Sequence, residues 1–434
     1  MDFRRTDDYT TLTPSQRAFV DLYYAGHNLF LTGEAGTGKS HVLRSLFDYL
    51  RDHGVAVAKT ASTGIAAFNI GGQTIHSWAG MGLAEGDAHE VLRNVKKNKK
   101  AIARMKQTKV LVLDEVSMIR GDLLDKLDIV LKYMRGSNRP FGGVQLILTG
   151  DFLQLPAIFK RGEVKTLAFQ SRSWREANIQ PALLTEIVRQ GEDGDFARLL
   201  GQIRVGDTSG LKLLASRVNA PLPDAEIEPT RIFCKNIEVD TFNRERLADI
   251  EQPLHTFASK DWGEERYIQQ FDKHCQAAKV LYLKVGAQVM LLQNLDVKRG
   301  LVNGSVGVVK GFAHDGVRVR FRYETVTVEM GQWEIKEQRV SVGGVLQYQT
   351  VATRSQYPLK LAYALSVHKS QGTTLDCAIV DMSEAFAESQ VYVALSRVRN
   401  LQSLFLHDFP SSAIRVNEDC LAFYRALEKP VATK

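Results

Sequence analysis

Eight residues, from Gly33 to Ser40, read G-E-A-G-T-G-K-S and fill the phosphate-loop pattern G-x-x-x-x-G-K-[ST] completely. An apolar strand pattern, 28–32, precedes this loop, and a helical pattern, 41–50, follows it. Backbone N–H groups of the loop and the helix N-terminus would surround a polyphosphate. Lys39 is expected to reach the β- and γ-phosphates, and the Ser40 hydroxyl to hold Mg²⁺. The sequence therefore predicts a site for a nucleoside triphosphate with its metal.

Two adjacent carboxylates, Asp114 and Glu115, end a second apolar strand pattern, 110–114. Opposite a phosphate loop, Asp114 would bind Mg²⁺ and Glu115 would polarise the attacking water. An acidic pair after a buried strand can also be an ordinary surface turn. A third strand pattern, 144–149, leads into G-D-F-L-Q, whose glutamine, Gln154, is placed to sense a γ-phosphate.

Two arginines are candidates to complete the site from a second domain: Arg189 in E-I-V-R-Q and Arg397 in V-A-L-S-R. An arginine supplied across a cleft stabilises transition-state charge, and it makes domain closure depend on the nucleotide. Most arginines are solvated surface residues, so residue chemistry alone leaves both roles open.

Apolar, β-branched runs alternate with helical patterns along most of the chain, which is typical of parallel sheets covered by helices. Further strands are expected at 55–60, 231–234 and 378–381. From about residue 280 to 350 the pattern changes to short strands, with an H-D-G turn before the alternating run that starts at Val317. This predicts a β-rich insert in an α/β domain whose pattern resumes near Leu359.

The bulk properties restrict the class of protein. A chain of 434 residues can form two or three domains, and its net charge of +7 favours a polyanionic partner. No signal region or apolar stretch of about 20 residues is present, so neither secretion nor a membrane span is expected. The four cysteines are Cys234, Cys275, Cys377 and Cys420, and they form no C-x-x-C pair. We therefore expect a reducing cytosol and no zinc site.

The motifs resemble those of the Pif (petite integration frequency) helicases, in group B of helicase superfamily one. The most specific block is P-F-G-G-V-Q-L-I-L-T-G-D-F-L-Q-L-P from Pro140, which separates this family from RecD-like relatives. At Ala157 many members carry a proline, and we expect no chemical consequence. Other blocks follow in the family's order over nearly the whole chain: L-T-P-S-Q from Leu12, T-A-S-T-G-I-A-A from Thr60, G-G-Q-T-I-H-S-W from Gly71, V-L-D-E-V-S-M-I from Val112, L-T-E-I-V-R-Q from Leu184, L-V-N-G-S-V-G-V-V from Leu301, L-A-Y-A-L-S-V-H-K-S-Q-G-T-T-L-D from Leu361 and V-Y-V-A-L-S-R-V from Val391.

The resemblance implies an α/β fold with two RecA-like parallel-sheet domains of the P-loop NTPase type. It implies a first domain at 1–185 with a small wedge near 65–75, and a second domain at 186–250 and 356–434. The insert, 251–355, would be a small β-barrel of the SH3-like type. The long N-terminal extension of eukaryotic members is absent, so we expect a bacterial or phage protein in the cytoplasm, associated with the nucleoid.

The resemblance also implies a role for each residue that matches a family motif, with ATP and Mg²⁺ as cofactors. Gln16 would read the adenine edge, and Gln371 with Gly372 would couple the nucleotide to the second domain. Phosphates and metal would be held by Gly33, Gly36, Thr37, Gly38, Lys39, Ser40 and Asp114, with Glu115 acting on water and Gln154, Arg189 and Arg397 on the γ-phosphate. Single-stranded DNA would contact Thr63, Gly64, Thr74, His76 and Trp78 in the first domain, and His368 and Lys369 in the second.

Residue chemistry agrees with these DNA contacts, because short hydroxyls and N–H groups suit phosphates and flat rings stack on bases. Trp78 fits a core position equally well. A basic run, 91–109, contains eight Lys or Arg residues and no acid, and it suits a solvated helix face or a DNA contact.

The family implies an ATP-dependent DNA helicase that moves 5′-to-3′ on single-stranded DNA and unwinds duplex or structured DNA. Expected partners are single-stranded DNA and single-strand/duplex junctions, with G-quadruplex DNA as a further candidate; no membrane is involved, and a monomer suffices. The residues leave two alternatives open: a DNA-stimulated ATPase switch that does not unwind, and an AAA+-type protein remodeller. The remodeller would carry a helical lid after the first sheet.

Overall fold

The structure is a computed structural model that describes residues 2–159, 163–186, 193–223, 225–296, 298–340, 346–381, 385, 387–407 and 409–427. Its contacts divide the chain into two compact units. The first comprises Met1–Phe152, Pro156–Val188 and Glu334–Val351, and the second Leu153–Leu155, Arg189–Trp333 and Ala352–Lys434. The expected insert, 251–355, is divided between these units: Glu334–Val351 groups with the first, and the rest groups with the second.

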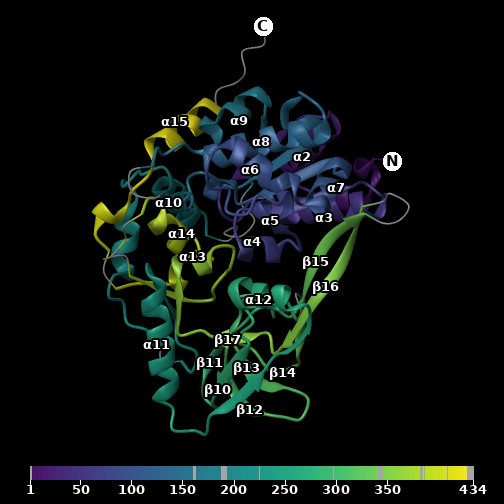
Figure 1. The fold of residues 1–434 in the computed structure, drawn as a ribbon. Helices are drawn as coiled ribbons and strands as arrows, with labels where there is room; N and C mark the ends of the chain where they lie inside the picture. Colours follow the sequence, from purple (N-terminus) through teal and green to yellow (C-terminus); the bar gives the residue numbers. More distant parts are fainter. Residues whose placement is uncertain are drawn as a thin grey trace. The chain divides into compact units, whose positions relative to one another are not determined.

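The first unit is built on a six-stranded sheet with the order β3-β2-β4-β5-β1-β6. Figure 1 labels the helices of this unit from α2 to α9. All its strand pairs are parallel, so the carboxyl ends of the strands lie along one edge. The strands are β1 (Leu29–Gly33), β2 (Val57–Ala61), β3 (Gln73–Thr74), β4 (Val110–Asp114), β5 (Gln145–Thr149) and β6 (Gln180–Leu184). The helices are α1 (Asp7–Thr11), α2 (Pro14–Tyr24), α3 (Lys39–Asp52), α4 (Gly64–Asn69), α5 (Ile75–Ala79), α6 (Ala88–Lys96), α7 (Lys99–Gln107), α8 (Gly121–Arg135) and α9 (Arg172–Glu176).

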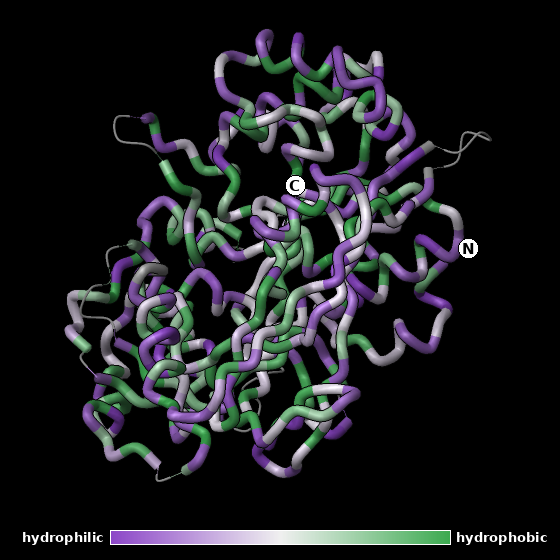
Figure 2. Tube along the Cα trace, turned by 60° about the horizontal axis from the view of Figure 1, so that its bottom comes forward, coloured by the Kyte–Doolittle hydropathy of each residue, from purple (hydrophilic) through white to green (hydrophobic). Residues whose placement is uncertain are grey.

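The core of the first unit explains why its central strands are almost wholly apolar. Every residue of β1 is buried, as expected for a parallel strand that is covered on both faces. Along many helices and strands, hydrophobic residues alternate with hydrophilic ones, so that one face can be buried (Figure 2). In α3 the buried residues recur with a helical period: Val42, Leu43, Leu46, Phe47 and Leu50.

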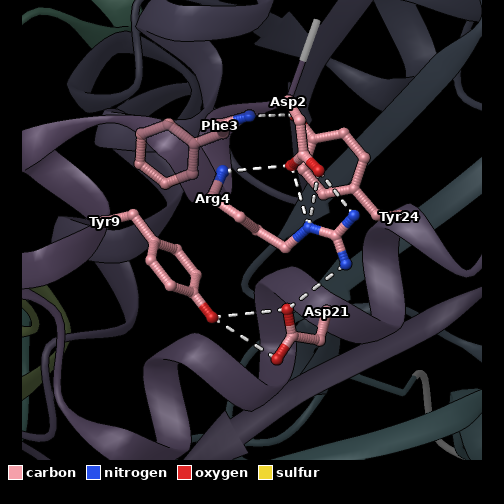
Figure 3. Close-up of polar contacts among 6 residues, drawn as sticks. All are labelled: Asp2, Phe3, Arg4, Tyr9, Asp21 and Tyr24. Carbon is pink, nitrogen blue, oxygen red and sulfur yellow. Dashed lines mark hydrogen bonds and ion pairs between the residues drawn. The ribbon is translucent and has the colours of Figure 1, made fainter.

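An N-terminal segment fastens α2, the helix that carries Gln16, to the unit (Figure 3). The Phe3 amide donates to the Tyr24 hydroxyl at 2.8 Å, and the Phe3 ring is fully buried. The Tyr9 hydroxyl donates to the Asp21 carboxylate at 3.3 Å. Because both contacts reach the carboxyl-terminal half of α2, they fix the direction in which its N-terminus points.

The P-F-G-G block forms a turn in which Phe141, Gly142 and Gly143 all have positive φ, of 51°, 63° and 77°. Two side chains of α8 hold this turn. The Phe141 amide donates to Asp128 Oδ1 at 2.7 Å, and Arg135 Nε donates to the Gly142 carbonyl at 2.8 Å. The most specific block of the sequence is therefore a left-handed turn clamped by the helix that precedes it.

A methyl group at position 142 should destabilise the first unit. A Cβ there would lie 2.6 Å from the Leu131 carbonyl oxygen, in addition to the left-handed backbone. We expect Gly142→Ala to lower the free energy of unfolding by about 2–4 kcal/mol, measured by urea denaturation. Gly136→Ala is the matched control, because Gly136 has a φ of 61° and no atom within 4 Å of its Cβ position. Equal losses in the two variants would show that the steric contact is unimportant.

The second unit has a parallel sheet with the order β18-β7-β19-β20. Its strands are β7 (Thr230–Phe233), β18 (Ala364–Ser366), β19 (Ala378–Val380) and β20 (Leu404–Leu406). The helices of this unit are α10 (Gly194–Arg204), α11 (Asn236–Ala248), α12 (Glu265–His274), α13 (Val367–Ser370), α14 (Gln390–Leu395) and α15 (Glu418–Leu427). The predicted strands at 231–234 and 378–381 are thus confirmed to within a residue.

The predicted β-rich insert is confirmed as antiparallel structure. Its described strands form sheets with the orders β14-β13-β12-β11-β17, β15-β16-β9 and β10-β8. The burial of β13 alternates along the strand, as V-R-V-R-F predicts, and the H-D-G turn joins it to β12. The strands are β8 (His255–Ala258), β9 (Lys260–Gly263), β10 (Val280–Leu283), β11 (Gln288–Leu291), β12 (Val306–Phe312), β13 (Val317–Phe321), β14 (Thr325–Val328), β15 (Gly331–Val340), β16 (Leu346–Gln356) and β17 (Leu359–Leu361).

A buried ion cluster joins the elements of the β15-β16-β9 sheet to α12. The Arg354 side chain is fully buried and donates to Asp261 at 2.7 Å and to Asp272 at 2.6 Å. Burial raises the pKa of Asp261, but the hydrogen bonds from Arg354 and Ser259 outweigh this and hold the pKa below its usual value.

Within the part of the chain that the structure describes, no helix is both long and apolar enough to cross a lipid bilayer.

Candidate functional site

The phosphate loop joins β1 to α3 at the carboxyl edge of the first sheet, as the sequence predicts. Gly38 has a φ of 84°, and a Cβ there would lie 2.6 Å from Gln16 Nε2. At Gly33 a Cβ would lie 2.6 Å from the Leu184 carbonyl oxygen, so side chains are excluded at both ends of the loop. This close packing leaves the backbone of the loop to line the site.

Lys39 and Ser40 start α3 directly behind the loop. Lys39 Nζ donates to the carbonyl oxygens of Gly33, at 2.8 Å, and Glu34, at 3.0 Å. These bonds hold the ammonium group over the loop, where a polyphosphate would bind at the helix N-terminus. The loop and Lys39 therefore lie at the start of α3, and the roles of Lys39 and Ser40 toward a nucleotide and its metal stay predictions.

Asp114 and Glu115 lie at the end of β4, on the same edge of the sheet as the loop. Burial raises the pKa of Asp114 to about 6, against the effects of the Glu115 amide and the Lys39 charge. The Glu115 amide donates to Asp114 Oδ1 at 2.9 Å, and Glu115 itself has a φ of 53°. A left-handed backbone is uncommon for glutamate and is found at functional sites.

The donor set fits Mg²⁺, because that ion prefers hard oxygen ligands and is usually held by few protein groups together with substrate phosphates. The Ser40 hydroxyl, in the first turn of α3, and the Asp114 carboxylate, at the end of β4, are such ligands. The charge of Lys39 opposes the burial that raises the pKa of Asp114.

Gln16 lies against the phosphate loop, as expected for a residue that serves the nucleotide. Its Nε2 donates to the Thr37 carbonyl at 3.2 Å, and its Oε1 accepts from the Thr13 amide at 3.1 Å. Both ends of the amide are thus bonded within the protein. The contact with adenine stays a prediction; the second N–H of Nε2 and the second lone pair of Oε1 are not used by these two bonds.

Glu186 is a residue that the sequence reasoning missed. Its carboxylate accepts from the Thr13 hydroxyl at 3.0 Å, from the Ser15 amide at 3.3 Å and from the Ser15 hydroxyl. It therefore anchors the start of α2, where Gln16 lies. The available signal was its place in L-T-E-I-V-R-Q, three residues before Arg189. Arg189 itself lies outside the described residues.

The DNA-binding candidates of the first unit lie at the same edge of the sheet, near β2 and β3. The Thr63 hydroxyl caps α4 by accepting from the Ala66 amide at 3.2 Å, and the Thr74 hydroxyl caps α5 by accepting from the Ser77 amide at 3.3 Å. Gly64 begins α4, and burial lowers the pKa of the half-buried His76. In the sheet order, β2 and β3 lie on the far side of β4 from β1, so the predicted DNA and nucleotide contacts are neighbours without overlapping.

Trp78 is buried, with only 1% of its surface exposed. Its Nε1 donates to Gln338 Oε1 at 3.0 Å, and Gln338 Nε2 donates to the Val57 carbonyl at 2.6 Å. Gln338 belongs to β15, and its end of the β15–β16 hairpin groups with the first unit. Of the two expected roles, the structure has Trp78 in the core position, with no ring face open to a base.

The candidates of the second unit share one short segment. His368 and Lys369 lie in α13, and Gln371 and Gly372 follow it directly. Arg397 is buried, and its Nη1 donates to the carbonyls of Ser370, at 3.2 Å, and Thr373, at 3.4 Å, on either side of Gln371 and Gly372. Arg397 thus braces the turn between the predicted DNA contacts and the predicted nucleotide contacts.

Gln154 is buried, five residues beyond the end of β5, and its segment groups with the second unit. Its contact with the γ-phosphate stays a prediction, as does the same role for Arg397.

The basic run folds into α6 and α7, whose apolar residues face inward. One of its cations, Arg104, is buried and donates to the carbonyls of Trp78 and Ser77, both at 2.5 Å. The other seven Lys and Arg side chains of the run are exposed. The run therefore combines a structural arginine with a solvated basic face.

The phosphate loop and the acidic pair lie at the carboxyl edge of a parallel sheet, and a second parallel sheet follows later in the chain. These features define a P-loop fold of the RecA-like class. A family model described as PIF1-like helicase matches residues 11–212, and one described as DNA helicase Pif1, 2B domain, matches residues 267–312. The chain belongs to the Pif1 family of helicases.

Two curated relatives show the extent of the similarity. The ATP-dependent DNA helicase Pif1 of Psychrobacter is 33% identical, over 93% of this chain and 69% of the relative. The ATP-dependent DNA helicase PIF1 of Danio rerio is 38% identical, over 96% of this chain and 64% of the relative. The chain thus spans less than two thirds of the length of the latter protein.

Solved structures of a Bacteroides Pif1 have the same fold. The unliganded form has a TM-score of 0.84 at 28% identity, over 96% of each chain. A complex of the Bacteroides protein with ADP-AlF3 and single-stranded DNA has a TM-score of 0.64 at 29% identity, over 96% of this chain and 97% of that one.

Proposed function

We propose that this protein is an ATP-dependent DNA helicase that moves 5′-to-3′ on single-stranded DNA and unwinds duplex or structured DNA. The observation that carries the proposal is the shared carboxyl edge of the first sheet, where the phosphate loop and the acidic pair adjoin the candidate DNA contacts near β2 and β3. Membership of a family whose relatives are named ATP-dependent DNA helicases supports it. The 5′-to-3′ direction rests on the family resemblance alone.

In the proposed cycle, the phosphate loop and Lys39 bind the triphosphate, and Glu115 orients the attacking water. Mg²⁺, held by Ser40 and Asp114, would neutralise phosphate charge. Gln154, Arg189 and Arg397 respond to the γ-phosphate. Because Arg397 braces the turn next to His368 and Lys369, a change at this turn alters the grip of the second unit on the strand.

The proposed partners are single-stranded DNA and its junctions with duplex, and G-quadruplex DNA is a further candidate substrate. We place the protein in the cytoplasm, where it acts as a monomer. The division of the chain into first domain, second domain and insert at residues 185, 250 and 355 belongs to the same proposal.

The test measures ATP turnover with and without single-stranded DNA, and then strand separation on duplexes with either a 5′ or a 3′ tail. We expect DNA to stimulate turnover, and strands to separate only when the tail is 5′. Turnover that ignores DNA would contradict the translocation mechanism, and activity on 3′ tails alone would reverse the polarity.

Two other functions make different predictions. A DNA-stimulated switch would hydrolyse ATP in response to DNA without separating strands. An AAA+-type remodeller would carry a helical lid after the first sheet, whereas the second unit contains a parallel sheet and antiparallel strands, which contradicts that alternative.

A further inference from the structure

A basic cavity lies in the first unit between the end of α8 and the P-F-G-G turn. It has a volume of about 510 Å³ and is lined by Lys106, Arg135, Ser137, Arg139, Gly142 and Gly143. Three of these residues are cations and none is acidic. The cavity joins two features that the nucleotide site does not use, because Lys106 belongs to the basic run and the glycines belong to the P-F-G-G block.

The cavity lies at the amino edge of the sheet, opposite the nucleotide. The Gln145 amide, at the start of β5, donates to the Lys109 carbonyl just before β4, at 3.1 Å. Arg135 Nη1 donates to the Thr108 carbonyl at 3.0 Å, in the same segment. Five-residue strands separate this edge from the phosphate loop by about 15 Å. A ligand in the cavity therefore cannot be the nucleotide bound at the loop.

Arg135 is fixed as a rigid donor in the wall of the cavity. Its Nη1 donates to the carbonyls of Met105, Lys106 and Thr108, and its Nε to that of Gly142. Among the described residues, Nη2 has no acceptor and no carboxylate pairs with this guanidinium. Burial without a counter-ion lowers the pKa of Arg135. An anion would supply both the missing acceptor and the missing charge.

The neighbouring cations are equally unpaired. Among the described residues, no carboxylate forms an ion pair with Lys106 or Arg139. The same is true of four further lysines of the basic run: Lys97, Lys99, Lys100 and Lys109. The Ser137 hydroxyl accepts from the Arg139 amide at 3.3 Å, which leaves its own hydrogen for a ligand. Several exposed, unpaired lysines in the run that supplies Lys106 suit a partner with many phosphates better than one small anion.

We propose that this cavity binds a backbone phosphate of DNA, through Arg135, Arg139 and Lys106, in a part of the substrate other than the strand at the carboxyl edge. The inference rests on the proposed function, because it assumes that the protein works on DNA. At a fork, the duplex is the DNA that can reach the amino edge while the tail occupies the carboxyl edge. Phosphate contacts of this kind give affinity and orientation without reading sequence.

The test uses the full chain carrying Lys106→Ala and Arg139→Ala together, since Arg135 also holds the turn. We expect affinity for a forked duplex to fall about tenfold, and the slope of log affinity against log salt to fall by about 1–2. Affinity for a single strand of about ten nucleotides should be unchanged, because a strand of this length fits only the track at the carboxyl edge. ATP turnover should also be unchanged. Lys165→Ala with Arg175→Ala is the matched control, since it removes one exposed lysine and one exposed arginine from the same unit.

Four outcomes would overturn the inference. Wild-type affinity of the cavity variant for the fork would overturn it, as would an equal loss for the fork and the short strand, which would assign the residues to the single-strand track. If the control variant lowers affinity for the fork as much as the cavity variant does, the loss reflects the overall charge of the protein and not the cavity. A wild-type protein that binds no DNA and whose turnover ignores DNA would overturn the proposed function as well, so the two failures are told apart by the wild-type arm.

Discussion

The Glu115→Gln variant is expected to hydrolyse ATP at least about 100-fold more slowly than the wild type. Glutamine has nearly the same shape as glutamate, but its amide cannot accept a proton from the attacking water. The backbone of residue 115 is left-handed, with its amide bonded to Asp114 at 2.9 Å, and this arrangement does not involve the Glu115 side chain. The nucleotide should therefore still bind. Steady-state turnover with saturating single-stranded DNA, and equilibrium binding of a fluorescent nucleotide, measure the two effects.

Glu176→Gln is the matched control for this substitution. Glu176 is a surface carboxylate of the same unit that pairs with Lys132 and Arg172. Its loss should leave turnover unchanged. If Glu115→Gln kept wild-type turnover, another group would activate the water; if it lost nucleotide binding as well, Glu115 would be needed to build the site.

Six strands of the two parallel sheets could be predicted from sequence because burial on both faces demands continuous apolar runs, whereas β3, β6, β18 and β20 were missed. The strand β4 occupies its predicted range, and β5 and β19 each differ from their own predicted ranges by a single residue. The phosphate loop was equally clear, since glycine, lysine and serine are each required at fixed positions. The antiparallel insert was visible because the residues of β13 alternate between buried and exposed, after a tight turn.

The sequence was less informative where a local pattern is completed by a distant residue. Trp78 bonds to Gln338, 260 positions later, so nothing in G-G-Q-T-I-H-S-W could show that its indole N–H is already used. The same holds for Arg104, which lies in a run of exposed cations but is bonded to the carbonyls of Ser77 and Trp78. In each case tertiary contacts decide between two readings that composition leaves equal.

Other features could have been found with closer attention to helix signals. Thr63 and Thr74 each stand before a helix, with the spacing of an N-cap residue, and their hydroxyls cap α4 and α5. This use does not remove them from the DNA track, because a capped helix start still presents backbone N–H groups to a phosphate. It does mean that replacing either threonine changes local helix stability together with any DNA contact.

The second large effect is expected at Trp78. The Trp78→Ala variant should lose about 3–5 kcal/mol of unfolding free energy, because it removes a fully buried ring and leaves a cavity. Trp78→Phe keeps most of the volume but leaves Gln338 Oε1 buried without its donor, so a smaller loss of about 1–3 kcal/mol is expected. Both values are measured by urea denaturation, from the first unfolding transition.

Trp262→Ala separates burial from residue type, because Trp262 is 63% exposed on β9 and its loss should cost no more than about 0.5 kcal/mol. Affinity for single-stranded DNA decides the role of the ring. As a core residue, Trp78 can be replaced by Phe with DNA affinity retained and stability reduced, since the ring never meets a base. The opposite result would be a Trp78→Ala variant with the unfolding free energy of the wild type and a lower affinity for DNA. In that case the indole would have to break its hydrogen bond to Gln338, leave the β15–β16 hairpin and stack on a base.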